Sequence, residues 1–326
     1  MDIMILLSIL WNDILPLVAF IGAGWYLDYR FKIDIGTYTK LTVWVAFPVF
    51  MFHIFYQYEA AGMEYLLVPM AAGGLAVQYL LSGLAGRCLH LDSEKNHIFQ
   101  AVSTFSNTGN IGIALIMMIY THPPFSDGGM PLLHEALGTM AILMIVMNVA
   151  VNVFGAASIR SRGASFAEYL LYLVKMPALY GVLLAVLLRA GGISIQHTFL
   201  WPVIEHLNGA FIVLIMVTAG VQFHRTAIKM PEMDILTACA LKLLGAPLLA
   251  FLLIKGAELA GGLSPLQAQV FFIFSAIPSS VSLIIYSVEY DNHKDFVTRS
   301  VFTNAILGAF TVTGAIYLSR LLFPLG

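Results

Sequence analysis

Long apolar stretches alternate along the chain with short segments that carry charges, glycine or proline. Each stretch has about the 20 residues that an α-helix needs to cross the hydrocarbon core of a bilayer. The stretches lie at residues 12–29, 37–57, 64–86, 96–120, 132–157, 167–190, 200–221, 232–256, 265–288 and 299–323. We therefore predict an all-α integral membrane protein with ten transmembrane helices, numbered here as spans one to ten.

The basic residues between these spans predict the orientation in the membrane. Of the 16 Lys and Arg, ten lie in one set of alternate connections, three in the other set and three inside spans. The first set holds Arg30, Lys32, Arg87, Lys95, Arg160, Arg162, Arg225, Lys229, Lys294 and Arg299; the second holds Arg189, Lys255 and Arg320; the spans hold Lys40, Lys175 and Lys242. By the positive-inside rule the first set is cytoplasmic, so both termini are expected on the extracytoplasmic side of the cell's inner (plasma) membrane.

Composition agrees with a bilayer protein and excludes several classes of function. Of the 326 residues, 60% are hydrophobic and 10% are charged, whereas soluble domains have about 45–50% apolar and about 25% charged residues. Little chain remains for a domain outside the membrane, which excludes nucleic-acid binders and secreted disulfide scaffolds. The start lacks the features of a signal peptide. Cys88 and Cys239 both lie in apolar surroundings and are expected to be unpaired.

Weak internal similarity predicts two halves. Thr104–Asn107, followed by an apolar run, resembles Phe274–Pro278 in span nine, and Pro16 of span one has a counterpart in Pro177 of span six. The halves would be residues 1–160 and 161–326, with five spans each. Because five is odd, the second half would enter the membrane from the opposite side, which is the inverted repeat of many secondary transporters.

Spans four and nine contain segments that disfavour a helix at matching depths. Span four carries Ser106–Gly112, with two amides, two hydroxyls and two glycines, and span nine carries Ser275–Ser282, in which Pro278 removes one helical hydrogen bond. Alone, each segment is readily explained by helix packing or a kink. Together, two interrupted helices at equivalent positions of inverted halves predict a binding site at the midplane.

The residue types predict the ligand of this site. Half-helix N-termini present free N–H groups suited to a carboxylate, whereas half-helix C-termini present carbonyls suited to a cation. Amides add donors without charge, so we expect a small organic anion. The candidate substrate-binding residues are Ser106, Asn107, Thr108, Gly109, Asn110, Ile277, Pro278, Ser279 and Ser280, with Lys242 and Ser282 in support.

Two lysines inside spans allow functional and structural interpretations. Lys242 is expected either to attract an anion, to brace the broken helices through their carbonyls, or to extend toward the membrane surface. Lys175 lies closer to the cytoplasmic edge, where a functional role is less expected. His53 and His206, near the outer ends of helices, are candidates for proton coupling but most histidines there are simply hydrogen-bonded.

At these residues the sequence resembles the auxin efflux carrier family of membrane transporters. The resemblance covers nearly the whole chain and is carried by the order and spacing of short segments. They are Phe47-Pro48 with Phe52, Phe105 to Gly112, Met176-Pro177, Gly220-Val221-Gln222, Lys242-Leu243 with Pro247, and Ala276-Ile277-Pro278 through Glu289-Tyr290.

The resemblance implies ten helices in two inverted repeats, in which spans four and nine cross at the site. Spans one, two, six and seven would form a scaffold, and spans three to five and eight to ten a mobile transport unit that shifts like an elevator. Related members carry organic anions, including indole-acetate in plants and malate or malonate in bacteria. The sequence departs from the family at Ala114, where proline is common, and at Lys242, where arginine is usual. The connection around Arg160 is short, which favours a bacterial type of carrier over plant-hormone transport.

Several alternatives stay open. A cation or proton antiporter of related fold usually needs a carboxylate at mid-membrane, and the sequence places none there. Sodium symport is compatible with Asn, Ser and Thr ligands, so sodium and protons are both candidate coupling ions, and a sodium site is one alternative. A homodimer is the alternative to a single chain. No cofactor is expected, and no metal-ligand spacing occurs. An enzyme is disfavoured because Ser279 and Ser280 lie far in depth from His53 and His206, and a receptor that transports nothing is the last alternative.

Overall fold

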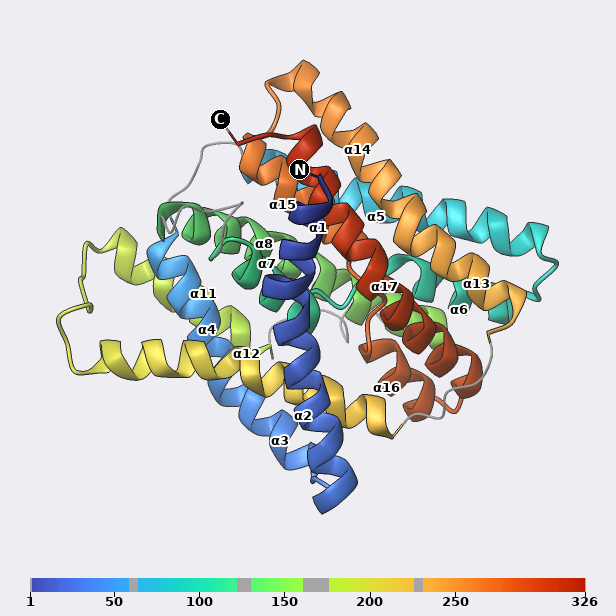
Figure 1. The fold of residues 1–326 in the computed structure, drawn as a ribbon, viewed down its shortest axis with the longest axis horizontal. Helices are drawn as coiled ribbons and strands as arrows, with labels where there is room; N and C mark the ends of the chain where they lie inside the picture. The colour runs from blue at the N-terminus through green and yellow to red at the C-terminus, as the bar shows by residue number, and fades with distance from the viewer. Residues whose placement is uncertain (1, 59–63, 122–129, 161–175, 226–230, 326) are drawn as a thin grey trace.

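The computed structural model describes residues 2–58, 64–121, 130–160, 176–225 and 231–325, and these residues fold into a bundle of helices (Figure 1). The helical segments, in which η1 to η5 are single π-helical turns and η6 is a short 3-10 helix, are as follows. They are α1 (Asp2–Ile9), η1 (Leu10–Ile14), α2 (Leu15–Phe31), α3 (Ile35–Leu41), η2 (Thr42–Ala46), α4 (Phe47–Gln57), α5 (Glu64–Cys88), α6 (Ser93–Thr104), η3 (Thr108–Gly112), α7 (Ile113–Ile119), α8 (Met130–Ala150), η4 (Val151–Gly155), α9 (Ala156–Ile159), α11 (Pro177–Ala190), α12 (Leu200–His224), α13 (Met233–Ala240), η5 (Leu241–Gly245), α14 (Ala246–Ala257), η6 (Glu258–Ala260), α15 (Pro265–Ala276), α16 (Ser282–Glu289) and α17 (Lys294–Leu322).

Seven continuous helices in this part of the chain are long and apolar enough to cross a membrane. They coincide with predicted spans one, two, three, five, seven, eight and ten. They run over Leu7–Phe31, Ile35–Gln57, Glu64–Cys88, Leu132–Ile159, Leu200–His224, Met233–Ala257 and Lys294–Leu322. The chain is thus an all-helical, multi-pass membrane protein, as predicted.

The other three predicted spans contain shorter helices. Span four consists of α6 and the helix Thr108–Ile119, and span nine consists of α15 and α16, so both are interrupted where the sequence predicted. Span six is represented by α11, and its first part, including Lys175, lies outside the described residues. In spans four and nine, the two short helices follow each other in series and together cover the length of one span.

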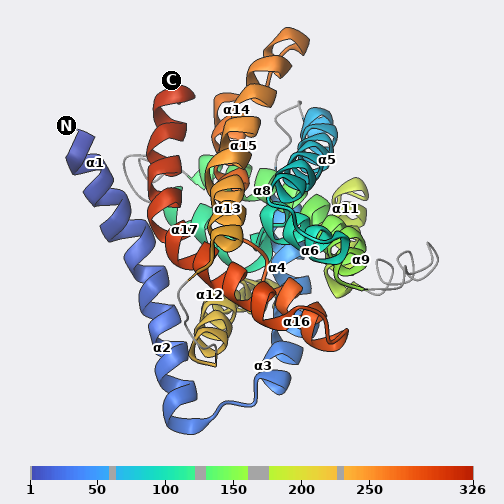
Figure 2. The same ribbon diagram turned by 90° about the vertical axis from the view of Figure 1, so that its right-hand side faces the viewer.

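The connections gather at two opposite sides of the bundle. In Figure 1 both termini lie in the upper part and the α11–α12 connection lies at the left, whereas the α5–α6 connection lies at the right and the α16–α17 connection at the lower right. Figure 2 shows the same separation, with the N-terminus, the C-terminus and α14 above and the α2–α3 connection below. The α2–α3, α5–α6 and α16–α17 connections, to which the sequence assigns the basic residues Arg30, Arg87 and Lys294, belong to one side, and the α11–α12 connection belongs to the other.

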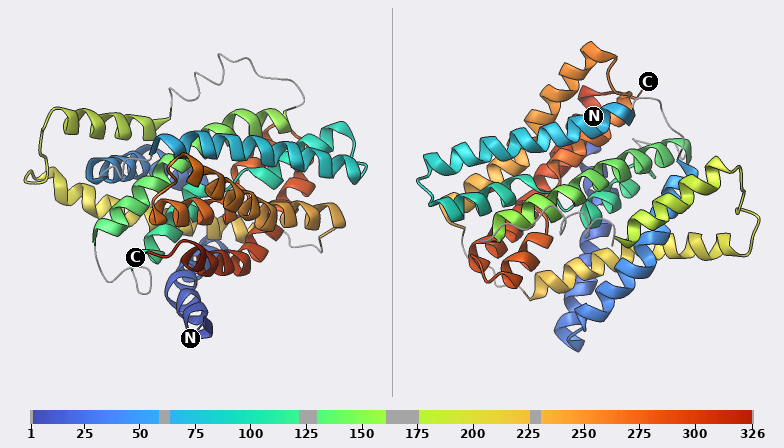
Figure 3. Two further views of the ribbon diagram at one scale, coloured as in Figure 1. Left: turned by 90° about the horizontal axis from the view of Figure 1, so that it is seen from above. Right: turned by 180° about the vertical axis from the view of Figure 1, so that it is seen from behind.

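Glycines bring two pairs of helices into backbone contact. A Cβ at Gly24 of α2 would overlap the backbone of Val217 in α12, and a Cβ at Gly220 of α12 would overlap the backbone of Ile21 and Trp25. A Cβ at Gly181 of α11 would likewise overlap the backbone of Pro48 in α4. Small residues at such crossings let helices in a membrane pack closely. Helices α2 and α12 therefore form one pair, and α4 and α11 form another (Figure 3).

Gly24→Ala is expected to lower the free energy of unfolding by about 1–3 kcal/mol, because the added methyl group meets backbone atoms that cannot move aside. Gly22→Ala on the same helix is the matched control, since nothing lies within 4 Å of a Cβ there. Thermal unfolding of both variants in the same detergent measures the difference. Equal melting temperatures for the two variants would contradict the close α2–α12 contact.

The cysteines and tryptophans differ in their exposure. Cys88 is exposed and Cys239 is buried, and neither forms a disulfide, as predicted. Trp11, Trp25 and Trp44 are exposed, as side chains facing lipid are. Trp201, in contrast, is only 8% exposed and packs against His53.

Candidate functional site

The interruptions of spans four and nine cross in the centre of the bundle and hydrogen-bond to each other. Ser106 and Ser279 form an isolated antiparallel bridge. The Asn107 N–H donates to the Pro278 carbonyl at 2.8 Å, and the Ser280 N–H donates to the Phe105 carbonyl at 2.9 Å. Backbone groups that leave a helix inside a membrane need such internal partners. We call these two paired segments, residues 105–107 and 277–281, the crossover.

Alternation along the paired segments separates neighbouring side chains. In extended backbone, successive side chains point to opposite faces. Asn107 and Ser280 face a cavity of about 370 Å³, whereas the Ser279 hydroxyl donates to the Val102 carbonyl at 2.5 Å on the other side. Ser106 lies at the boundary and lines this cavity as well as a smaller one.

The larger cavity, which we call the central cavity, collects side chains from spans two, four, five, seven and nine. Its polar lining consists of hydroxyl and amide groups, with no charged side chain among the described residues. The polar members are Thr39, Thr42, Ser106, Asn107, Thr108, Asn110, Asn148, Asn152, Thr218, Gln222, Ser280, Ser282 and Tyr286. Phe47 and Phe211, whose rings stack at 5.4 Å, form part of its apolar wall.

Two half-helices begin at this cavity. The helix Thr108–Ile119 starts with Thr108, Gly109 and Asn110, and α16 starts with Ser282; all four residues line the cavity. The first N–H groups of a helix have no partner within the helix, and its dipole is positive at that end. The positive ends of both half-helices therefore lie at the central cavity.

Several buried polar atoms near the crossover have no hydrogen-bond partner in the described part of the chain. They are the Asn107 amide nitrogen Nδ2 and the hydroxyls of Thr104, Ser106 and Thr108. Burying an amide N–H without an acceptor is costly, so such groups in a cavity indicate a bound polar ligand or water. Nδ2 can only donate, so it is suited to bind an acceptor oxygen in the cavity.

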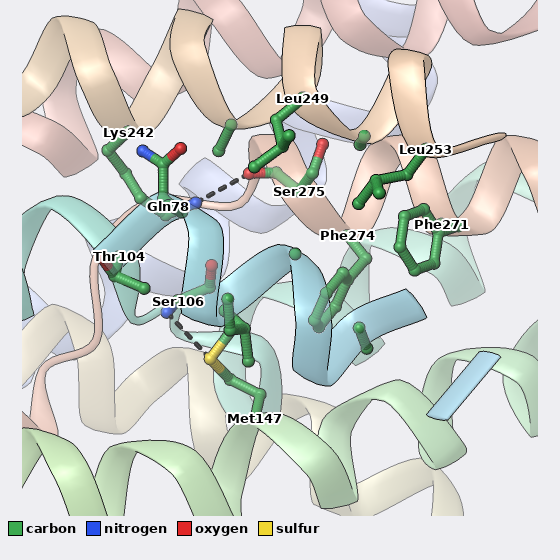
Figure 4. A pocket seen from close by; sticks show the side chains of 15 residues that line it. Gln78, Thr104, Ser106, Met147, Lys242, Leu249, Leu253, Phe271, Phe274 and Ser275 are labelled. Atoms are coloured by element: carbon green, nitrogen blue, oxygen red, sulfur yellow. Dashed lines mark hydrogen bonds between the residues drawn. The ribbon is translucent and has the colours of Figure 1, made fainter. Parts of the chain in front are cut away.

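The half-helix C-termini lie on the other side of the crossover, beside a cavity of about 40 Å³ (Figure 4). The Lys242 ammonium donates to the Ser275 carbonyl at 2.7 Å, in the last turn of α15. The Gln78 amide donates to the Ser103 carbonyl at 3.2 Å, in the last turn of α6, and to the Leu241 carbonyl at 2.9 Å. Lys242 is 1% exposed. A cation and an amide thus satisfy carbonyls at the negative ends of both half-helices.

The structure distributes the predicted site residues over these two sides. Ser106, Asn107, Thr108, Gly109, Asn110, Ser280 and Ser282 line the central cavity. Ile277, Pro278 and Ser279 do not line it. Ile277 is fully buried, and the Pro278 ring packs against α17 at Gly308, where a Cβ would overlap it. Lys242 lines only the smaller cavity, where it makes the bracing contact that was one of its expected roles.

Other lining residues were missed by reasoning from sequence. Asn148 and Asn152 lie four residues apart on one face of span five, and Asn152 accepts a hydrogen bond from the Tyr286 hydroxyl. Paired amides inside a membrane helix were the available signal. Thr42 and Asn152 also lie in π-helical turns, which are often found at functional sites and which the sequence did not predict.

Comparison with known proteins finds similarity to membrane transporters. Residues 36–169 match the model of the family described as "Membrane transport protein". An uncharacterized transporter of Methanothermobacter thermautotrophicus is 23% identical over 287 residues, which are 84% of this chain and 85% of that protein. The matched residues 36–169 include spans two to five and therefore the first half of the crossover. Both matches are to membrane transporters, in agreement with the resemblance found in the sequence.

Proposed function

We propose that this chain, a multi-pass membrane transporter of the family matched by residues 36–169, is a secondary transporter of small organic anions. Monocarboxylates or dicarboxylates of the size of malate or malonate are the expected substrates. The substrate would bind in the central cavity, at the crossover. No enzymatic activity is part of this proposal.

One observation carries the proposed substrate class: the central cavity combines two positive half-helix ends with a buried amide donor that has no acceptor in the described part of the chain. Carboxylate oxygens are strong acceptors, and helix N-termini favour negative charge. The cavity lining described above has no carboxylate to repel the guest. Its volume of about 370 Å³ accommodates a small carboxylate together with several waters, since one water occupies about 30 Å³.

The close helix pairs support a division into a scaffold and a transport unit. Pairing of α2 with α12 joins spans one and seven, and pairing of α4 with α11 joins spans two and six. These pairs would be related to each other by an inverted repeat of residues 1–160 and 161–326. The central cavity lies between this group and the helices of spans four, five and nine. We propose that the transport unit, spans three to five and eight to ten, shifts against the scaffold like an elevator.

The central cavity lies toward the side of the bundle that carries the basic connections. Thr39 and Thr42 lie near the start of span two, and Gln222 and Tyr286 lie near the ends of spans seven and nine. With the basic connections in the cytoplasm, the structure would correspond to an inward-facing state. Both termini would then lie on the extracytoplasmic side of the plasma membrane.

A sodium-coupled anion carrier is the second candidate, because the hydroxyls of Thr104 and Ser106, which have no partner among the described residues, both belong to residues that line the smaller cavity. Oxygen ligands of this kind bind sodium without a carboxylate. A cation antiporter is a weaker candidate, since the described lining offers no carboxylate to exchange protons for the cation.

A thermal-shift panel of monocarboxylates and dicarboxylates on the purified protein is expected to single out small carboxylates by a raised melting temperature. A ligand at 100 times its dissociation constant stabilises the folded state by about 2.7 kcal/mol. Uptake of the best ligand into proteoliposomes then tests transport, and replacing sodium with choline tests sodium coupling. Stabilisation by organic cations, with no response to any carboxylate, would overturn the proposed substrate class.

A further inference from the structure

A third cavity of about 210 Å³, which we call the outer cavity, lies at the opposite end of the same helices. The central cavity is lined by the start of span two, whereas the outer cavity is lined by its end, at His53 and Gln57. His134 of α8 and Glu205 and Asn208 of α12 complete its polar lining. The outer cavity thus brings two imidazoles and one carboxylate together from three helices. None of these residues contributes to the central cavity.

Contacts around the outer cavity hold its groups in place. The His53 ring stacks on Trp201 with a centroid distance of 5.4 Å, and the Trp201 indole N–H donates to Glu205 Oε1 at 2.8 Å. Glu205 is therefore fixed beside His53 by a shared tryptophan. His134 lies on α8, which approaches the end of α4 so closely that a Cβ at Gly138 would overlap the Tyr58 ring.

The remaining charged and titratable groups around α4 are engaged elsewhere. Arg189 of α11 donates to the Phe55 carbonyl at 3.2 Å, and His206 Nδ1 lies 2.5 Å from the Pro202 carbonyl of its own helix. Glu64 accepts from the Tyr58 hydroxyl at 2.6 Å, and Glu135 accepts from the Ser264 hydroxyl at 3.2 Å. The groups that face the outer cavity together are His53, His134 and Glu205.

The outer cavity also lies at the boundary that alternating access must open. Helices α4 and α12 belong to the proposed scaffold, and α8 belongs to the proposed transport unit. Neutral imidazoles can share a small cavity, but two imidazolium ions repel each other, and one carboxylate balances only one of them. Histidine gains a positive charge on acidification, so this boundary would respond to protons.

We propose that His53, His134 and Glu205 form a proton-binding site that couples protons to transport. Protonation of both imidazoles favours separation of α8 from α4 and α12, which opens the outer cavity. Loss of the protons restores the close contact seen here. The inference rests on the proposed function, and it adds protons as the coupling ion at a place remote from the crossover.

Tryptophan fluorescence tests proton binding independently of transport, because an imidazolium in contact with an indole quenches its emission. Trp25 also lies 5.1 Å from a histidine, His224, so the titration is done on a Trp25→Phe background. Trp201 emission is expected to fall on acidification, as the His53 ring that stacks on it gains a proton. His53→Gln removes this step and His134→Gln shifts it to higher pH, because the second positive charge is gone. His206→Gln is the matched control and leaves it unchanged. A titration that is the same in all four proteins would overturn the site.

Transport in proteoliposomes tests the coupling. An inward proton gradient is expected to accelerate net carboxylate uptake by the wild type and by His206→Gln, and this acceleration is lost in His53→Gln and His134→Gln. Exchange of labelled for unlabelled carboxylate without a gradient persists in all of them, because the crossover is intact. Exchange without any effect of the gradient in the wild type overturns the coupling but leaves the proposed function standing. Absence of both exchange and carboxylate binding overturns the proposed function, and the fluorescence titration then decides the proton site by itself.

Discussion

Asn107→Asp is expected to weaken carboxylate binding about a hundredfold or more, because like charges in close contact cost several kcal/mol and each 1.4 kcal/mol is a factor of ten. The Asn107 amide faces the central cavity, is buried, and has a donor nitrogen without a partner among the described residues. The substitution preserves its size and shape but replaces the donor with a negatively charged acceptor. Ligand-induced thermal shifts and uptake into proteoliposomes measure the loss.

Two further variants separate the effect of charge from that of a lost hydrogen bond. Asn107→Ala removes only the donor and is expected to weaken binding about tenfold, as for one hydrogen bond to a charged group. Asn12→Asp makes the same chemical change far from the central cavity, in η1, where Asn12 bonds to Ser8, and is expected to leave binding unchanged. If Asn107→Asp bound carboxylates as well as the wild type does, the substrate would not contact this residue.

Lys242→Glu is expected to destabilise the protein by at least about 3 kcal/mol, the cost of leaving a buried charge uncompensated. The ammonium of Lys242 is buried and donates to the Ser275 carbonyl at the negative end of α15. A carboxylate at that position would face a carbonyl oxygen and a helix C-terminus, both of which repel it. Thermal unfolding in detergent and the yield of monodisperse protein measure the effect.

Lys242→Met provides the comparison for this prediction. Methionine fills a similar volume and introduces no charge, so it loses the hydrogen bond to Ser275, which costs about 1–3 kcal/mol if the carbonyl stays unsatisfied. The loss is partly offset because a buried charge no longer has to be desolvated. We therefore expect Lys242→Met to be clearly more stable than Lys242→Glu. Equal stability of the two variants would show that Lys242 does not brace α15 electrostatically.

The sequence predicted the positions of the long helices and of both interruptions. Hydrophobic stretches of the right length predicted the seven continuous spans, and Pro278 and the Asn- and Gly-containing segment 106–112 predicted the breaks. These signals are local, since they depend on propensities within one span. The extent of the first break was less predictable: Gly109 and Asn110 lie in a π-helical turn, and only residues 105–107 leave the helix.

The sequence could not predict which side of the crossover each side chain faces. Ser279 and Ser280 are adjacent residues of the same type, yet the Ser279 hydroxyl donates a hydrogen bond to the Val102 carbonyl, whereas Ser280 lines the central cavity. Their difference arises from pairing with residues 105–107, more than 170 positions away. The same holds for Lys242, whose partner carbonyl is on another span. Contacts between distant segments set these roles, and propensity within one span contains no information about them.

The Ser106–Ser279 bridge makes the crossover a minimal β-ladder, and a ladder has a register. Deleting or inserting one residue between α6 and η3 would turn the following side chains to the opposite face. Asn107 would then point toward the smaller cavity at Lys242, and a different side chain would line the central cavity in its place. The spacing of residues in this segment is therefore as much part of the site as their identity.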